Sequence, residues 1–227
     1  MTINFYNYSC FKVQSGDFII AFDPPSKESG LKTPRFQTDV ILISHNHKAH
    51  NGADVLSLKE ENPHFIINTP GEYEIKGAII KGIESFHDAK EGSERGLNTI
   101  FTVDLEDIKI CFLGDCGENK FRPETKEAIA KIDILFLPIS GPFITPKAAV
   151  SLINEIEPKI IIPMHYDGSD PKQIASQLDG ASKKNKELGS FLKEFSEENI
   201  EKLDKLTIKK KDINEEKMRV VALESNL

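Results

Sequence analysis

The chain has 227 residues, of which 39% are hydrophobic and 29% charged, which is the composition of a folded protein and not of a disordered one. Its net charge of −7 excludes broad, non-specific binding to nucleic acid. No apolar run approaches the ~20 residues that a membrane helix needs, and the first residues lack the pattern of a signal peptide. The three cysteines are not spaced like a disulfide framework. We therefore expect one cytoplasmic domain over residues 1–227 that binds no membrane.

The first third of the chain shows patterns typical of β-strands. Residues 3–14 and 18–23 are apolar-rich runs separated by Ser15-Gly16-Asp17, which predicts a hairpin. The four consecutive apolar residues within 39–44 predict a strand that is buried on both faces. Further strands are predicted at 64–68, 78–83, 99–104 and 108–113.

Helices alternate with buried strands in the second half of the chain. Thr145-Pro146 places a hydroxyl at a helix N-cap and a proline at the first helical position, and Asp170-Pro171 repeats this device. Between these two helix starts, residues 159–163 are dense in isoleucine, as are residues 132–139 before them. Both runs predict buried strands.

The last segment, residues 181–227, has a different pattern. Its apolar residues first follow helical spacing, at Leu188, Phe191, Leu192 and Phe195. Two later apolar runs, 206–208 and 218–223, predict two strands around a charged turn. We expect this segment to form a helix and a hairpin that pack on the core as part of the same domain.

Three of the six histidines, His45, His47 and His50, lie in one hexapeptide directly after the predicted buried strand 39–44. Imidazole is the commonest neutral metal ligand, and loops at the carboxyl ends of strands are places where side chains converge. Three histidines at this spacing are hard to explain by packing alone. The hexapeptide therefore predicts a metal site.

Three further candidate ligands also follow apolar strands. His87, Asp115 and His165 each stand at the end of such a run. Taken singly, they can be interpreted as a surface residue, a turn former and a neighbour of a helix cap. Taken together, the strand ends predict one shared rim. His64 opens its strand instead of ending it, and we interpret it as structural.

This pattern resembles the metallo-β-lactamase superfamily, whose signature is His-x-His-x-Asp-His, then a distant His, a Gly-Asp and a last His. The resemblance covers about residues 3–180, and it is greatest to the small hydrolase branch that includes the ascorbate-phosphate lactonases. The segments that carry it are Tyr8-Ser9-Cys10-Phe11, Phe22-Asp23-Pro24, Arg95-Gly96-Leu97-Asn98-Thr99, Leu113-Gly114-Asp115, Leu137-Pro138-Ile139-Ser140-Gly141 and Ile162-Pro163-Met164-His165-Tyr166.

The resemblance implies an α+β fold of the αββα class: a metallo-β-lactamase-like four-layer sandwich with two mixed β-sheets flanked by helices. It also implies a metal centre of one or two divalent ions. The first would be bound by His45, His47 and His87, and the second by His50 and His165. Asp115 would bridge the two and act in catalysis. Zinc is the expected ion, and manganese or iron would suit the same ligands.

Two positions depart from the family pattern. Position 49 is Ala where the motif has Asp, so the second metal lacks a carboxylate ligand. Lys48 beside it either adds charge to the rim or faces solvent, and Asp88 or Cys116 could supply the missing ligand. At Asn7-Tyr8, relatives often carry Gly-His.

The resemblance implies a metal-dependent hydrolase that acts on an ester, lactone or phosphodiester of a small metabolite through a metal-bound hydroxide. The alternative is a weakened or non-catalytic metal-binding member of the fold, because of Ala49. Antibiotic β-lactamases usually carry a secretion signal, the nucleases an inserted domain, and the glyoxalase-type thioesterases a helical extension. None of these features is evident here. The expected partner is a small-molecule substrate, and a homo-oligomer is left open.

Overall fold

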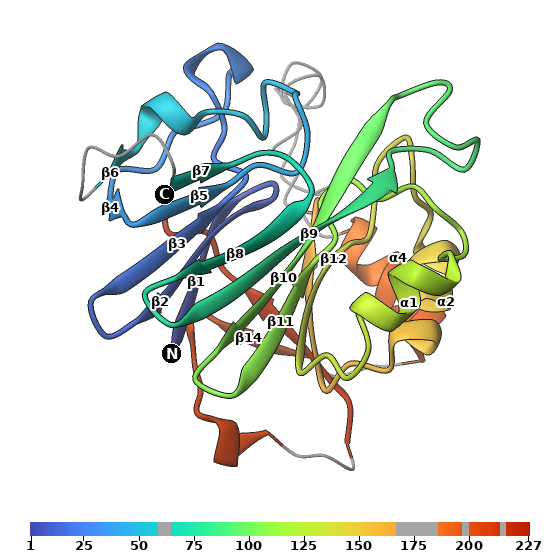
Figure 1. Cartoon of the computed structure of the whole chain (residues 1–227). Helices are drawn as coiled ribbons and strands as arrows, with labels where there is room; N and C mark the ends of the chain where they lie inside the picture. Colours follow the sequence, from blue (N-terminus) through green and yellow to red (C-terminus); the bar gives the residue numbers. More distant parts are fainter. Residues whose placement is uncertain (59–64, 167–185, 197–199, 214–216) are drawn as a thin grey trace.

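Two mixed β-sheets face each other in the structure, a computed structural model (Figure 1). The structure describes residues 1–58, 65–166, 186–196, 200–213 and 217–227. Within these ranges no helix is long and apolar enough to cross a membrane. His64 and the expected helix start at Asp170-Pro171 lie outside the described residues. The two mixed sheets with helices outside confirm the predicted sandwich class.

The first sheet has six strands. Their order is β15 (Leu206–Thr207), β1 (Thr2–Asn7), β2 (Cys10–Ser15), β3 (Phe18–Phe22), β5 (Val40–Leu42) and β7 (Ile66–Ile67). The hairpin predicted around Gly16 is confirmed, because Ser15 pairs with Phe18 across an antiparallel β2–β3 ladder. The single run predicted over 3–14 is wrong, because the chain reverses at Tyr8-Ser9 and gives two strands. Tyr8 makes this turn with φ 52°, a left-handed conformation that non-glycine residues rarely adopt.

The second sheet has eight strands. Their order is β14 (Glu201–Leu203), β16 (Arg219–Leu223), β13 (Ile160–Met164), β12 (Ile134–Pro138), β11 (Ile108–Phe112), β10 (Leu97–Leu105), β9 (Ala78–Phe86) and β8 (Gly71–Ile75). The five strands from β14 to β11 are parallel and the others are antiparallel. Every residue of β12 and β13 is buried, which explains their uninterrupted apolar sequence. β4 (Gln37–Thr38) and β6 (Ser57–Leu58) form a small separate pair.

Phenylalanine rings fill the space between the two sheets. Phe11 of the first sheet contacts Phe136 of the second at 4.4 Å between ring centroids, and Phe22 contacts Phe112 at 5.0 Å. All four rings are fully buried. Tilted aromatic pairs of this kind contribute about 0.5–1.5 kcal/mol each beyond the area that they bury. These ring contacts pack the two sheets against each other.

The α-helices within the described ranges cover the outer face of the eight-stranded sheet (Figure 1). They are α1 (Pro123–Ala128), α2 (Pro146–Ile156) and α4 (Lys186–Phe195). The predicted start of α2 is confirmed, since Thr145 Oγ1 accepts a hydrogen bond from the backbone N–H of Ala148 at 3.2 Å. The helix predicted from Leu188 to Phe195 is also confirmed. The 3₁₀ turns are η1 (Lys27–Ser29), η2 (Ala53–Val55) and η4 (Lys210–Asp212).

The hairpin predicted within residues 181–227 is wrong. Leu206 of β15 pairs with Ile3 in the six-stranded sheet, whereas Val220 of β16 pairs with Ile161 in the eight-stranded sheet. β15 is the edge strand of its sheet, whereas β16 lies between β13 and β14 in the other. The segment therefore contributes to both sheets, and the limits of a single domain over 1–227 stay a prediction.

Candidate metal centre

The predicted ligands follow the carboxyl ends of strands from both sheets. His45, His47 and His50 lie in the loop after β5, His87 directly follows β9, and Asp115 and His165 lie just beyond β11 and β13. Two backbone hydrogen bonds connect the sheets here: Thr99 donates to the carbonyl of Ser44, and His165 donates to that of Tyr8. The strand ends therefore meet at one edge of the sandwich.

The carboxylate of Asp115 lies at the centre of the cluster. Its Oδ2 atom is 3.2 Å from Nε2 of His87, 3.4 Å from Nε2 of His50 and 3.7 Å from Nε2 of His45. Its Oδ1 atom is 3.2 Å from Nε2 of His165. One buried carboxylate thus contacts four imidazole rings.

The potential ligands fall into three overlapping groups, each with its ligand atoms within 4.8 Å of one another. The groups are His45–His47–His50, His45–His87–Asp115 and His50–Asp115–His165. Asp115 belongs to the last two, which is the arrangement that a bridging ligand needs. His47 is exposed and joins only the first group among the described residues.

The donor set fits divalent metal ions. The Nε2 atoms of His45, His50, His87 and His165 and the Oδ1 atom of Asp115 are buried and have no hydrogen-bond partner among the described residues. Buried polar atoms are rarely left unpaired unless an ion, a water or a ligand satisfies them. Ligands about 2.1 Å from a tetrahedral zinc ion lie about 3.4 Å from one another, close to the spacing around Asp115. Imidazole and carboxylate ligands suit zinc, manganese and iron alike.

A second carboxylate, which the sequence analysis did not assign, orients His50. Asp23 Oδ2 lies 2.8 Å from Nδ1 of His50, and both side chains are fully buried. Ser44 holds Asp23 in place through its backbone N–H at 2.7 Å and its hydroxyl at 2.6 Å. A hydrogen bond at Nδ1 leaves Nε2 as the nitrogen that faces Asp115.

Two further polar residues support the ligands. Ser44 Oγ lies 3.0 Å from Nδ1 of His45. Asn98 Oδ1 accepts a hydrogen bond from the backbone N–H of Asp115 at 3.0 Å, while its amide group donates to Ser85 Oγ and to the carbonyl of Leu113. These buried contacts fix the turn that presents Asp115.

Comparison with known proteins identifies the family. A family model of the β-lactamase superfamily domain matches residues 2–165. The chain belongs to the metallo-β-lactamase superfamily. The crystal structure of a protein of this superfamily from Thermotoga maritima, assigned as a zinc-dependent hydrolase, is 28% identical, with a TM-score of 0.75 and coverage of 99% of both chains.

Curated relatives carry the name of metal-dependent hydrolases. A UPF0173 metal-dependent hydrolase of Thermococcus onnurineus is 25% identical, over 76% of this chain and 89% of that protein. One of Listeria monocytogenes is 26% identical, over 85% of this chain and 99% of that protein. This superfamily member is therefore similar in length and sequence to proteins named as metal-dependent hydrolases.

The cluster of this superfamily member combines neutral and charged groups. Burial lowers the pKa of His45 to about 2 and that of His165 to about 4, so both rings are neutral at pH 7. Burial also lowers the pKa of His50, but the carboxylates of Asp115 and Asp23 outweigh it and raise that pKa to about 10. Burial raises the pKa of Asp115, whereas the charges of His50 and His165 hold it well below its usual range.

Ala49 departs from the superfamily motif, and the structure shows that neither proposed substitute replaces its carboxylate. Ala49 is buried. The Asp88 carboxylate accepts four backbone hydrogen bonds within its own loop, including those from Lys90 and Arg95 at 2.8 Å. The Cys116 thiol is buried 3.9 Å from Glu118. Neither residue belongs to a metal-binding group among the described residues.

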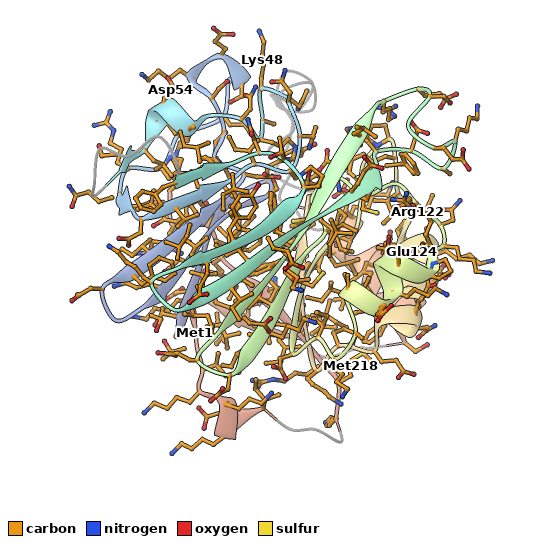
Figure 2. The ribbon with its side chains drawn as sticks, viewed as in Figure 1. Met1, Lys48, Asp54, Arg122, Glu124 and Met218 are labelled. Atoms are coloured by element: carbon orange, nitrogen blue, oxygen red, sulfur yellow. The ribbon has the colours of Figure 1, made fainter. Side chains whose placement is uncertain are left out.

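A polar cleft of about 790 Å³ opens beside His47. Lys48 points away from the molecule in Figure 2, and its ammonium pairs with Glu28 at 3.2 Å. Asp54, also labelled there, pairs with Lys27 at 3.5 Å. The cleft is lined by Ser26, Lys27, Glu28, Asn46, His47, Lys48, Asn51 and Asp54. The cleft therefore places two ion pairs and two asparagine side chains next to the histidine cluster.

Proposed function

We propose that the chain is a metal-dependent hydrolase that cleaves an ester, lactone or phosphodiester bond in a small metabolite. One observation carries the proposal: four buried imidazole nitrogens gather around the carboxylate of Asp115, and none of these nitrogens, nor Oδ1 of Asp115, has a hydrogen-bond partner among the described residues. Such a site serves little purpose in packing. Zinc is the ion that we propose, with manganese and iron as alternatives.

The residues of the site would have different roles: some would bind the ions, one would balance their charge and one would orient a ligand. A bound dication would lower the pKa of a coordinated water and polarise the bond to be cleaved. His45, His47 and His87 would hold one ion, His50 and His165 the other, and Asp115 would contact both. The low pKa of Asp115 keeps it ionised at neutral pH, so it offsets part of the positive charge. Asp23 holds the Nδ1 side of His50 and fixes the direction of its Nε2 atom.

The surroundings of the cluster support a small, polar substrate. The cleft beside His47 is lined by charged, amide and hydroxyl groups, and its charged residues pair with one another across it. A lactone or ester metabolite with hydroxyl groups would find hydrogen-bonding partners there. The resemblance to the ascorbate-phosphate lactonase branch also favours a lactone among these substrates.

The cysteines support a reducing compartment for this hydrolase. Cys10, Cys111 and Cys116 are buried and unpaired. Burial raises the pKa of the Cys111 thiol to about 12 and keeps it protonated at neutral pH. Free thiols without disulfides are typical of cytoplasmic proteins, and we propose that compartment.

A second candidate function is metal binding without catalysis, and Ala49 favours it. The buried alanine contributes no charge where the motif has a carboxylate, so two dications would face Asp115 alone among the carboxylates of the three ligand groups. Fewer anionic ligands weaken the binding of a second dication. A protein with one ion would then serve as a binding or structural member of the fold.

One experiment separates the two candidates. The protein is purified without chelator, its metal content is measured, and it is assayed against chromogenic esters, lactones and phosphodiesters with added Zn²⁺ or Mn²⁺. The His87→Ala variant serves as the matched control. Hydrolysis that needs metal and is lost in the variant supports the hydrolase. Bound metal without hydrolysis of any member of the panel supports the second candidate.

A further inference from the structure

The histidines of the cluster differ in how their rings are held. Metal-binding histidines usually donate their other ring nitrogen to an oxygen atom that fixes the ring. His50 has Asp23 and Ser9 within 2.9 Å of its Nδ1 atom, and His45 has Ser44 at 3.0 Å. The Nδ1 atom of His165 is buried and has no hydrogen-bond partner among the described residues. Among the described residues, His165 is therefore oriented by contacts of another type.

Tyr8 supplies such a contact. Its ring stacks on that of His165 with 3.9 Å between centroids and 15° between planes. The same ring meets the edge of His50 at 5.3 Å and 63°. Tyr8 thus touches both imidazoles of the His50–Asp115–His165 group. From these contacts we propose that Tyr8 is the positioning residue of this group and holds His165 by stacking in place of a hydrogen bond, an inference that rests on the proposed function.

The backbone places the two rings together. Tyr8 has φ 52° and His165 has φ 64°, both in the left-handed region that costs a non-glycine residue energy. The backbone N–H of His165 donates to the carbonyl of Tyr8 at 2.9 Å. Two strained turns from opposite sheets are therefore joined by a hydrogen bond at the point where their rings stack. Strain of this kind persists where the surrounding structure fixes it, and it concentrates at functional sites.

A second aromatic ring, that of Phe143, also contacts His165. Phe143 meets His165 edge-on at 5.7 Å and 86°, and it meets His87 at 5.0 Å and 64°. His165 is therefore held between a stacked ring and a perpendicular one. An imidazole that binds a cation becomes electron-poor, and the electron-rich face of a phenol ring favours such a neighbour. Stacking can thus orient His165 and also favour its metal-bound form.

Cobalt titration tests this role without relying on hydrolysis. Co²⁺ is added to the metal-free full chain, and binding is followed by visible absorption, which reports the number and the geometry of its ligands. Tyr8→Leu removes the ring and keeps the same backbone penalty at φ 52°. We expect it to weaken Co²⁺ binding at the His50–Asp115–His165 group by about tenfold, the size of effect of residues that orient metal ligands. Tyr8→Phe keeps the ring and should stay within about twofold of the wild type.

Tyr6→Leu is the matched control, because Tyr6 lies on β1 two residues before Tyr8 and stacks on Phe36 at 5.1 Å, with no ring contact to a histidine among the described residues. Its cobalt affinity should equal that of the wild type. Tyr8→Gly replaces Tyr8→Leu if the latter does not fold, since glycine adopts the left-handed conformation freely. A folded Tyr8→Leu or Tyr8→Gly protein with wild-type cobalt affinity and spectrum would overturn the proposal. Wild-type protein that binds cobalt but hydrolyses nothing would contradict the proposed function alone.

Discussion

Asp23 Oδ2 lies 2.8 Å from Nδ1 of His50, and neither side chain is exposed to solvent. The contact selects the nitrogen of His50 that faces Asp115. It also places a second negative charge behind a cluster whose ligand groups contain one carboxylate. The proposed metal centre should therefore depend on a residue that would touch neither of its ions.

Asp23→Asn should reduce metal affinity about 10-fold to 100-fold, because an amide cannot match the charge and the hydrogen-bonding pattern around His50. Competition with a chromogenic chelator measures this affinity. Asp39→Asn is the control, since Asp39 is another buried carboxylate, which bonds Ile19 and Lys76 away from the histidines. Equal affinities in the two variants would contradict the orienting role of Asp23.

Ala49→Asp should raise bound metal toward two ions per chain and increase hydrolysis of at least one ester or phosphodiester. The change adds one negative charge and one oxygen ligand where the superfamily motif expects them. Ala49→Asn adds similar bulk without charge and should do much less. Metal content is measured by mass spectrometry after removal of free ions. Equal metal content in wild type and Ala49→Asp would show that the wild-type site already binds its full complement.

Gly114→Ala should disturb Asp115 and destabilise the fold. Gly114 has φ 59°, and an added Cβ would lie 2.5 Å from both Asn98 Oδ1 and Ser44 Cβ. Such overpacking costs about 1–3 kcal/mol of unfolding free energy. Gly16→Ala is matched in backbone conformation, at φ 56°, but meets no atom within 4 Å. Urea unfolding and metal content should separate the two, and loss of metal in both variants would contradict a local effect at Asp115.

Asp88 should make the stability of its loop depend on pH. Burial raises the pKa of its carboxyl, but hydrogen bonds from the backbone N–H groups of Arg95, Lys90, Glu94 and Gly92 outweigh burial and lower it. A lowered folded-state pKa gives stability that is present above the unfolded value of about 3.9 and is lost as the pH falls through the folded value. Asp88→Asn should thus be less stable than wild type at pH 7, and the difference should shrink in acid. A constant difference across that range in urea unfolding would contradict this account.

The sequence was most informative where a potential metal ligand stands at the end of an apolar run. His45 and His165 follow strands that are buried throughout, Asp115 follows a largely buried strand and His87 a partly exposed one, so their polarity stands out against the apolar residues before them. Strands β9, β11 and β13 run in the same direction within one sheet, and their ends must meet at the same edge. The shared rim followed from these patterns, whereas the sandwich followed from the resemblance to the superfamily.

The sequence was less informative about contacts between distant segments. Asp23 ends the apolar strand β3, which was the available signal, but nothing in the sequence relates it to His50. The reversal at Tyr8-Ser9 was missed because a tyrosine in left-handed conformation is not a recognisable turn signal. The strands near Leu206 and Val220 were expected to pair because they are neighbours in sequence, whereas each pairs with a strand from a distant part of the chain, β1 and β13 respectively.

Anomalous X-ray diffraction at the zinc absorption edge, from crystals of the full chain grown with Zn²⁺, tests the central claim most directly. The account predicts an anomalous peak about 2.1 Å from Nε2 of His45 and of His87, with Asp115 as a further ligand. A second, weaker peak is predicted beside His50 and His165. Zinc-soaked crystals with no peak inside this cluster, or with His87 turned to solvent away from His45, would contradict it.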